Sequence, residues 1–165
     1  MVQALACGIT DVASLQLSNS GAGDLTPLWP EAGLDLNLDC HTIAHDYNQN
    51  RNATTVQRRE QLETFFFDHF AYLLDALAAV PEGPDGGRML DSTLVLWCKN
   101  LGYNHTGREM LFILAGGAGG ALQTGRFVSL PGRSHNDLLV SVCQLMGLPD
   151  TTFGDPELCD GALPL

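Results

Sequence analysis

Residues 92–120 read Ser-Thr-Leu-Val-Leu-Trp-Cys-Lys-Asn-Leu-Gly-Tyr-Asn-His-Thr-Gly-Arg-Glu-Met-Leu-Phe-Ile-Leu-Ala-Gly-Gly-Ala-Gly-Gly and join two apolar runs across a polar turn. The runs at 93–97 and 111–114 are short, continuously apolar and rich in Val, Ile, Leu and aromatic residues. This pattern predicts strands that are buried on both faces of a parallel sheet. Ligands of such sheets bind beyond the carboxyl ends of the strands, so we expect the segment 98–108 to form the functional edge.

Two helices are predicted on either side of this stretch. The first begins at a capping box, Thr-Thr-Val-Gln at 54–57, and runs to about 80, before Pro-Glu-Gly-Pro at 81–84. The second begins at another capping box, Ser-His-Asn-Asp at 134–137, and ends at Gly147. Helix, strand, turn and strand in this order predict the α/β class. The apolar face of the first helix consists of Leu62, Phe66, Phe70, Leu73, Leu77 and Val80.

The rest of the chain is less periodic. We expect the end of a helix at 1–7, a strand at 12–17, a short strand at 127–130 and an irregular tail at 150–165. Residues 18–53 are dense in Gly, Asn, Asp and Pro, which predicts a long loop. The length of 165 residues and the 45% hydrophobic content suit one domain over 1–165.

The composition argues against several classes of partner. With a formal net charge of −11 and only eight Lys and Arg residues, the chain is not expected to bind nucleic acids or anionic membranes. No apolar run approaches the roughly 20 residues that span a bilayer, and residues 1–8 lack the basic region of a secretory signal. The five cysteines contain no C-x-x-C pair, so neither a zinc ribbon nor a complete disulfide framework is predicted.

Two histidines in the predicted loop form a candidate metal site. His41 and His45 are four residues apart, so on a helix they would share a face and could hold one ion such as Zn²⁺. Asp39 and Asp46 flank them as candidate ligands or second-sphere partners. The alternative interpretation, two solvated histidines in a polar loop, is the commoner case for such residues.

Several stretches together resemble one bacterial family, known as domain of unknown function 1552. They include His-Thr-Ile-Ala-His at 41–45, Leu-Val-Leu-Trp at 94–97 and Phe-Gly-Asp-Pro at 153–156, together with residues 4–17, 70–77, 114–126 and 135–147. The fold of that family is similar to the alkaline phosphatase and sulfatase superfamily. The resemblance therefore implies a partial three-layer sheet-and-helix domain, matching the C-terminal part of an extracytoplasmic protein whose nucleophile and first metal-binding carboxylate lie in the N-terminal part.

The resemblance also bears on the site residues. His105 is similar to the family's histidine after the first strand and would complete a metal site with His41 and His45. The family has Ser where this chain has Ala44, and it has Asn-Glu where this chain has Lys99-Asn100. A protonated Lys has no lone pair to donate and repels a divalent cation. Lys99 and Arg108 could instead bind an anionic group at the sheet edge.

We therefore expect a chain without autonomous catalysis, with no catalytic residue and no bound organic cofactor. Two alternatives stay open. The first is a residual metal-dependent phosphate- or sulfate-ester hydrolase that uses His41, His45 and His105. The second is an interaction module that self-associates or pairs with a missing N-terminal half. The small-molecule ligand is not predicted by any motif, since the glycines at 116–120 lack the Gly-Lys-Ser/Thr ending of a phosphate-binding loop.

Overall fold

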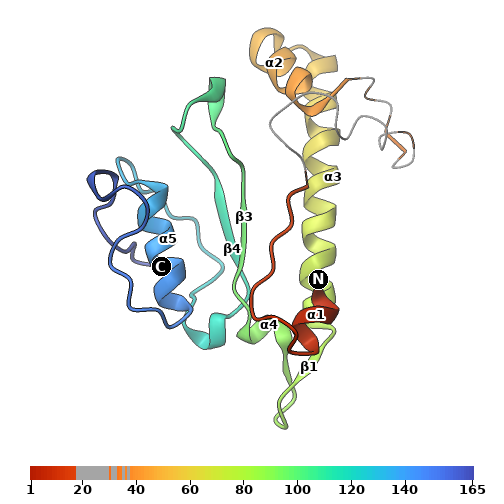
Figure 1. The fold of residues 1–165 in the computed structure, drawn as a ribbon. Helices are drawn as coiled ribbons and strands as arrows, with labels where there is room; N and C mark the ends of the chain where they lie inside the picture. Colours follow the sequence, from red (N-terminus) through yellow and green to blue (C-terminus); the bar gives the residue numbers. More distant parts are fainter. Residues whose placement is uncertain (18–29, 31–32, 35, 37) are drawn as a thin grey trace. The chain divides into compact units, whose positions relative to one another are not determined.

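The computed structural model describes residues 1–165 except 18–29, 31–32, 35 and 37 (Figure 1). Two compact units make up the chain. The first contains Met1–Ala76 and Trp97–Phe112, and the second contains Leu77–Leu96 and Ile113–Leu165. Helices and small antiparallel sheets place the chain broadly in the α/β class. The first unit holds all three histidines of the predicted metal site.

The predicted loop at 18–53 contains a helix, which corrects the sequence prediction. Helix α2 spans Cys40–Asn50, whereas residues 18–29, 31–32, 35 and 37 of that loop lie outside the described part of the chain. Asp39 caps the helix, because its carboxylate accepts from the backbone N–H of Thr42 at 2.9 Å and from the Thr42 hydroxyl at 2.8 Å. One apolar residue, Ile43, is buried in α2.

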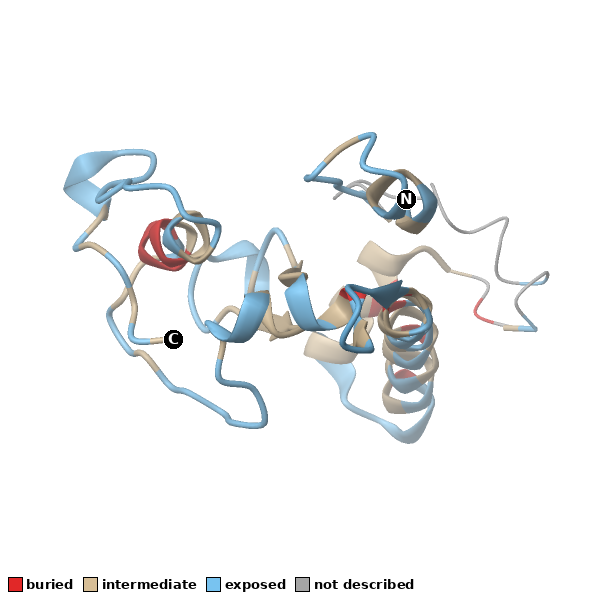
Figure 2. Cartoon of the chain, turned by 90° about the horizontal axis from the view of Figure 1, so that it is seen from below, coloured by how far each residue is buried: buried red, intermediate tan, exposed pale blue. Residues whose placement is uncertain are grey.

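Helix α3 spans Ala53–Ala78 and forms the long axis of the first unit (Figure 1). Its cap is Asn52 rather than the predicted Thr54, since the Asn52 side chain accepts from the Thr55 N–H at 3.1 Å. The predicted apolar face is confirmed at Leu62, Phe70 and Leu77, which are buried. Figure 2 shows such buried positions scattered along the otherwise exposed or half-buried helix.

Two packing clusters hold the first unit together. Leu36, Ile43 and Leu62 form a buried core that joins α2 to α3. Further along α3, the ring of Trp97 lies 5.3 Å from Phe70, 5.9 Å from Phe67 and 6.4 Å from Phe66, measured between centroids. Aromatic pairs at these separations add to the burial of apolar area. Trp97 therefore fixes the start of the following loop against α3.

The two central strands are present, but their arrangement differs from the prediction. Strand β3 spans Val95–Cys98 and β4 spans Phe112–Ala115; they pair with each other in a two-stranded antiparallel sheet, and all but exposed Cys98 are half-buried (Figure 1). The prediction of parallel strands buried on both faces is therefore wrong. A continuous apolar run indicates a strand but carries no information on the direction of its neighbour.

Glycines at the end of β4 explain why the chain returns beside the start of β3. The Gly117 N–H donates to the Leu90 carbonyl at 3.0 Å, and the Ala118 N–H donates to the Thr93 carbonyl at 3.1 Å. A Cβ on Gly116 would overlap the Thr93 carbonyl oxygen, and Gly116 also has a φ of 85°. Helix α4, Met89–Ser92, supplies this contact surface.

The remaining elements are short. Helix α1 spans Val2–Ala6, β1 at Pro81–Glu82 pairs with β2 at Gly87–Arg88, and single turns lie at Tyr103–His105, Ala118–Gly120 and Pro156–Leu158. Residues 12–17 and 127–130 are not strands, which corrects two predictions. Val12, Leu15 and Phe127 are exposed, so the apolar pattern there does not mark a buried sheet face. No helix in the described part combines the length and the apolar character needed to cross a bilayer.

Helix α5, His135–Leu145, confirms the second predicted capping box. The side chains of Ser134 and Asp137 satisfy each other's backbone N–H groups, and the helix ends in a Schellman pair in which the N–H groups of Gly147 and Leu148 donate to Gln144 and Cys143. Figure 2 shows its buried face. The tail at 150–165 is irregular apart from the one turn at Pro156–Leu158, as predicted.

Candidate metal centre

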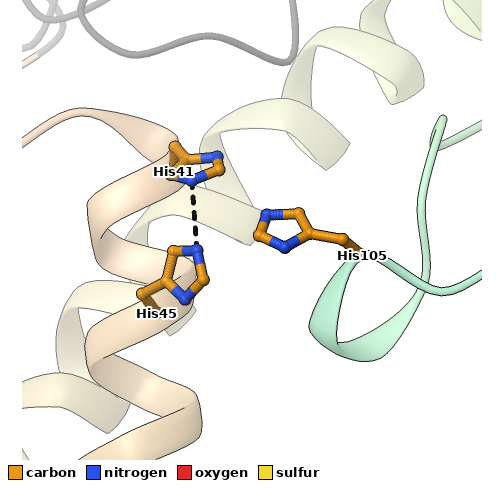
Figure 3. Close-up of side chains that lie close together, drawn as sticks. All are labelled: His41, His45 and His105. Carbon is orange, nitrogen blue, oxygen red and sulfur yellow. Dashed lines mark hydrogen bonds between the residues drawn. The ribbon is translucent and has the colours of Figure 1, made fainter.

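Three histidines from two separate segments converge in the first unit. His41 and His45 come from α2, and His105 comes from the segment between β3 and β4 (Figure 3). One possible ligand atom from each residue lies within 4.8 Å of the other two. The ring centroids are 4.6 Å apart for His41 and His45, 5.1 Å for His41 and His105, and 4.9 Å for His45 and His105. The predicted grouping is therefore present.

The helical pair is held by the geometry of α2. A spacing of four residues places His41 and His45 on one helical face, and their Nε2 atoms lie 3.1 Å apart. At this distance one ring nitrogen donates a hydrogen bond and the other accepts it. Both side chains are half-buried. Ile43, which lies between the two histidines on α2, is buried together with Leu62 of α3. This contact fixes α2 against α3 and therefore also fixes the histidine pair.

The third histidine lies in a turn with an uncommon backbone. Asn104 and His105 have φ values of 55° and 59°, in the left-handed region that residues other than glycine seldom adopt. The Gly102 N–H donates to the Thr106 carbonyl at 2.8 Å and closes the turn around them. His105 is exposed, whereas its ring is directed toward the α2 pair (Figure 3). Backbone strain of this kind persists where the surrounding contacts enforce it.

The distances suit a small transition-metal ion. A tetrahedral zinc ion with bonds of about 2.0–2.1 Å holds its ligand nitrogens about 3.3 Å apart. The 3.1 Å separation of the His41 and His45 Nε2 atoms is close to that edge length. The possible ligand atoms of the three histidines lie within 4.8 Å of one another, so binding of one ion would require them to draw closer together. Three neutral imidazoles would leave the charge of a divalent ion uncompensated and a fourth coordination position for another ligand.

The predicted carboxylate partners do not belong to this group. Among the described residues, the cluster consists of the three histidines without Asp39 or Asp46. Asp39 is occupied by its capping hydrogen bonds instead. Burial raises the pKa of the Asp39 carboxyl, but hydrogen bonds from the Thr42 backbone and hydroxyl outweigh this effect and hold the pKa below its usual value. The Asp39 carboxylate therefore stabilises α2 by accepting hydrogen bonds from the first turn of the helix.

Lys99, the residue that argued against a metal, is directed to α3. Its Nζ donates to both carboxylate oxygens of Glu63, at 2.6 and 2.8 Å, and Glu63 also forms an ion pair with Arg59. The Lys99 charge is thus paired rather than free to bind an anion. Arg108, the other cation proposed for that role, is exposed.

Sequence reasoning missed Glu63 and Gly102. Glu63 reads as one more charge on the solvent face of α3, and only the structure pairs it with Lys99. Gly102 reads as an ordinary turn glycine, yet a Cβ there would overlap the Arg108 carbonyl oxygen. A signal for α2 was present in Asp39, an N-cap residue type just before His41.

Comparison of the sequence with family models, with curated proteins and with solved structures gave no match.

Proposed function

We propose that this protein binds one divalent transition-metal ion, zinc in the first place, through His41, His45 and His105. The observation that supports the proposal is the convergence of three imidazoles from α2 and from the β3–β4 segment. Imidazole nitrogen suits zinc, copper and nickel, whereas calcium and magnesium prefer oxygen ligands. The net charge of −11 also favours the approach of a cation.

Titration of the metal-free protein with Zn²⁺, in competition with a chromophoric chelator, tests the proposal. We expect one ion per chain. Removal of a ligand in His41→Ala, His45→Ala or His105→Ala should lower the affinity by more than about a hundredfold, beyond the usual effect of changing an outer partner. His69→Ala is the matched control, because His69 is an exposed residue of α3 that does not belong to the histidine cluster. Equal affinities in all four variants would overturn the proposal.

We also propose that the bound metal does not by itself make the chain a phosphatase or sulfatase. Among the described residues no carboxylate or thiol joins the three histidines, so none stands in the cluster as nucleophile or general base. Aryl phosphates and aryl sulfates, assayed with Zn²⁺, Mn²⁺ and Ca²⁺, should show no turnover above that of the free ion. Metal-dependent turnover that His41→Ala abolishes would contradict this view.

One observation favours the hydrolase alternative. Catalytic zinc sites commonly have three protein ligands and an open fourth position, where the ion lowers the pKa of bound water. A group of three histidines with exposed His105 at its rim has this composition. The turnover assay above separates the two proposals, because a water-activating site should hydrolyse an activated ester and a purely binding site should not.

The family resemblance supplies the wider proposals. We propose that the chain corresponds to the C-terminal part of a three-layer, alkaline-phosphatase-like domain that functions outside the cytoplasm and associates with other chains. The order α3, β3, β4 and α5 supports the layered arrangement, and exposed apolar side chains such as Phe127 and Ile9 support association. An experimental structure of the chain in its native assembly tests both.

A further inference from the structure

The segment that carries His105 begins at Lys99, and the Lys99 side chain attaches it to α3. Most of residues 101–109 are exposed, so apolar packing contributes little to holding this segment in place. Lys99 directly follows β3 and donates to both oxygens of Glu63, at 2.6 and 2.8 Å. The Lys99 side chain is 38% exposed and the Glu63 side chain 24% exposed, so water screens this ion pair only in part.

Adjacent residues of α3 hold both halves of the metal site. Leu62 packs against Ile43 and thereby fixes α2 with its two histidines. The next residue, Glu63, binds Lys99 and thereby fixes the segment that carries His105. Arg59, one turn earlier in α3, forms a second ion pair with Glu63 and limits the directions its carboxylate can take. One turn of α3 is therefore the common frame for the three ligands.

We propose that Lys99 and Glu63 are positioning residues for the third metal ligand. The inference rests on the proposed function, since it explains how the apo chain keeps His105 near His41 and His45. When the competent arrangement is only partly populated, the apparent dissociation constant rises in inverse proportion to that population. Loss of the ion pair lowers the population of chains in which His105 faces the pair, and zinc affinity falls with it.

The sign of one substitution distinguishes positioning from simple electrostatics. If Lys99 acted only through its charge, Lys99→Met would remove a repulsive cation and raise zinc affinity. Positioning predicts the opposite. The affinity of Lys99→Met should fall by about two- to fivefold, the effect expected from a partly exposed ion pair. The zinc affinity of Glu63→Gln should fall by a similar factor, and that of Lys99→Arg should stay near the wild-type value.

A double-mutant cycle completes the test. Zinc affinities of wild type, Lys99→Met, Glu63→Gln and the double variant are measured by chelator competition, with Arg88→Met as the control for loss of an ion pair in the second unit. Because the two residues act through one contact, the double variant should bind zinc at least as tightly as the single variant with the lower affinity. The visible spectrum of Co²⁺ bound in place of zinc should change in Lys99→Met and stay unchanged in Arg88→Met.

The outcomes separate this inference from the metal proposal itself. Failure of the wild type to bind zinc would overturn both. Binding by the wild type, loss of binding in His105→Ala and unchanged or higher affinity in Lys99→Met would overturn the positioning role alone. Fully additive single effects would also contradict it. Lower affinity in Lys99→Met, restored in Lys99→Arg and accompanied by an altered cobalt spectrum, supports it.

Discussion

Gly102 is the residue on which the turn around His105 depends most. A Cβ at this position would overlap the carbonyl oxygen of Arg108 and lie 3.1 Å from that of Thr106. Both are backbone atoms, so they cannot move aside without shifting the turn. The Gly102 N–H also donates the hydrogen bond that closes the turn. A glycine is therefore required here by close approach of the backbone.

We predict that Gly102→Ala lowers zinc affinity by about tenfold or more, the size expected when the support of a ligand is lost. Gly107→Ala is the matched control, because the added Cβ at Gly107 in the same segment meets nothing within 4 Å. Chelator competition measures both affinities. If the two alanine variants bind zinc equally well, the turn does not govern the position of His105.

The sequence predicted the residues of this site more fully than their surroundings. The spacing of His41 and His45 favours a shared face only if the segment is helical, and the polar composition of 40–50 hides the helix. His105 entered the prediction through a family resemblance, since a turn histidine carries no spacing signal of its own. Its approach to the pair depends on left-handed backbone at 104–105 and on the Lys99–Glu63 ion pair. Such long-range contacts are invisible in a single sequence.

At the scale of elements, α3 owes its position to a few buried side chains. Phe70 is 8% exposed and its ring contacts Trp97, whereas Tyr72, two residues along the same helix, is 75% exposed. Phe70→Ala should lower the free energy of unfolding by about 3–5 kcal/mol. Tyr72→Ala should change it by about 0.5 kcal/mol or less. Urea denaturation compares the two, and equal midpoints would show that the Trp97 contact does not stabilise the helix.

Helix α5 and the tail are joined through one buried carboxylate. Asp137 is fully buried, and it accepts from Arg133 Nε at 2.7 Å, from the Ser134 N–H at 3.2 Å and from the Asp160 N–H at 2.7 Å. The Arg133 guanidinium, together with these backbone donors, holds the pKa of the Asp137 carboxyl below its usual value of 3.8 despite burial. Arg133 also donates to the Gly161 carbonyl at 2.8 Å, which ties the tail to the helix.

This lowered pKa predicts how stability depends on pH. The ionised carboxylate stabilises the folded state fully above the unfolded pKa of about 3.8, and this stabilisation is lost as the pH falls through the lower folded pKa. Asp137→Asn should be less stable than the wild type at pH 7, and its free energy of unfolding should decrease less on acidification. Asp85→Asn, in the exposed β1–β2 turn, is the control. Urea midpoints between pH 7 and pH 3 that run parallel in wild type and Asp137→Asn would contradict this.

Elements with local signals were predicted well, and their pairing was not. Helix α5 begins at its predicted capping box and ends at Leu145, two residues before the predicted stop signal Gly147, because both signals act within a few residues. Strand β3 begins two residues after the start of the predicted run 93–97 and ends one residue after its end, and β4 is shifted by one residue from the run 111–114. Their antiparallel pairing depends instead on Gly116 and Gly117 meeting α4 and Thr93. The strands predicted at 12–17 and 127–130 failed because an alternating or apolar pattern without burial does not form a sheet.

At the scale of the whole molecule, exposed apolar side chains predict self-association. Phe127 is 87% exposed, Ile9 77% and Val12 74%, which are high values for large hydrophobic residues. The net charge of −11 opposes unspecific precipitation, so we expect discrete oligomers. Sedimentation velocity at several concentrations should show a shift toward larger species that the double variant Ile9→Ser/Phe127→Ser reduces. One monomeric species at every concentration would contradict the prediction.

The central claim is that His41, His45 and His105 form one metal site. X-ray absorption at the zinc edge, recorded on the protein loaded with one equivalent of Zn²⁺, tests it most directly. We predict three imidazole nitrogens at about 2.0–2.1 Å and one further light atom. The imidazole signal should shrink in His105→Ala and persist in His69→Ala. Sulfur neighbours at about 2.3 Å, or oxygen neighbours without imidazole, would contradict the account, because the ion would then be bound by cysteines or by solvent rather than by the three histidines.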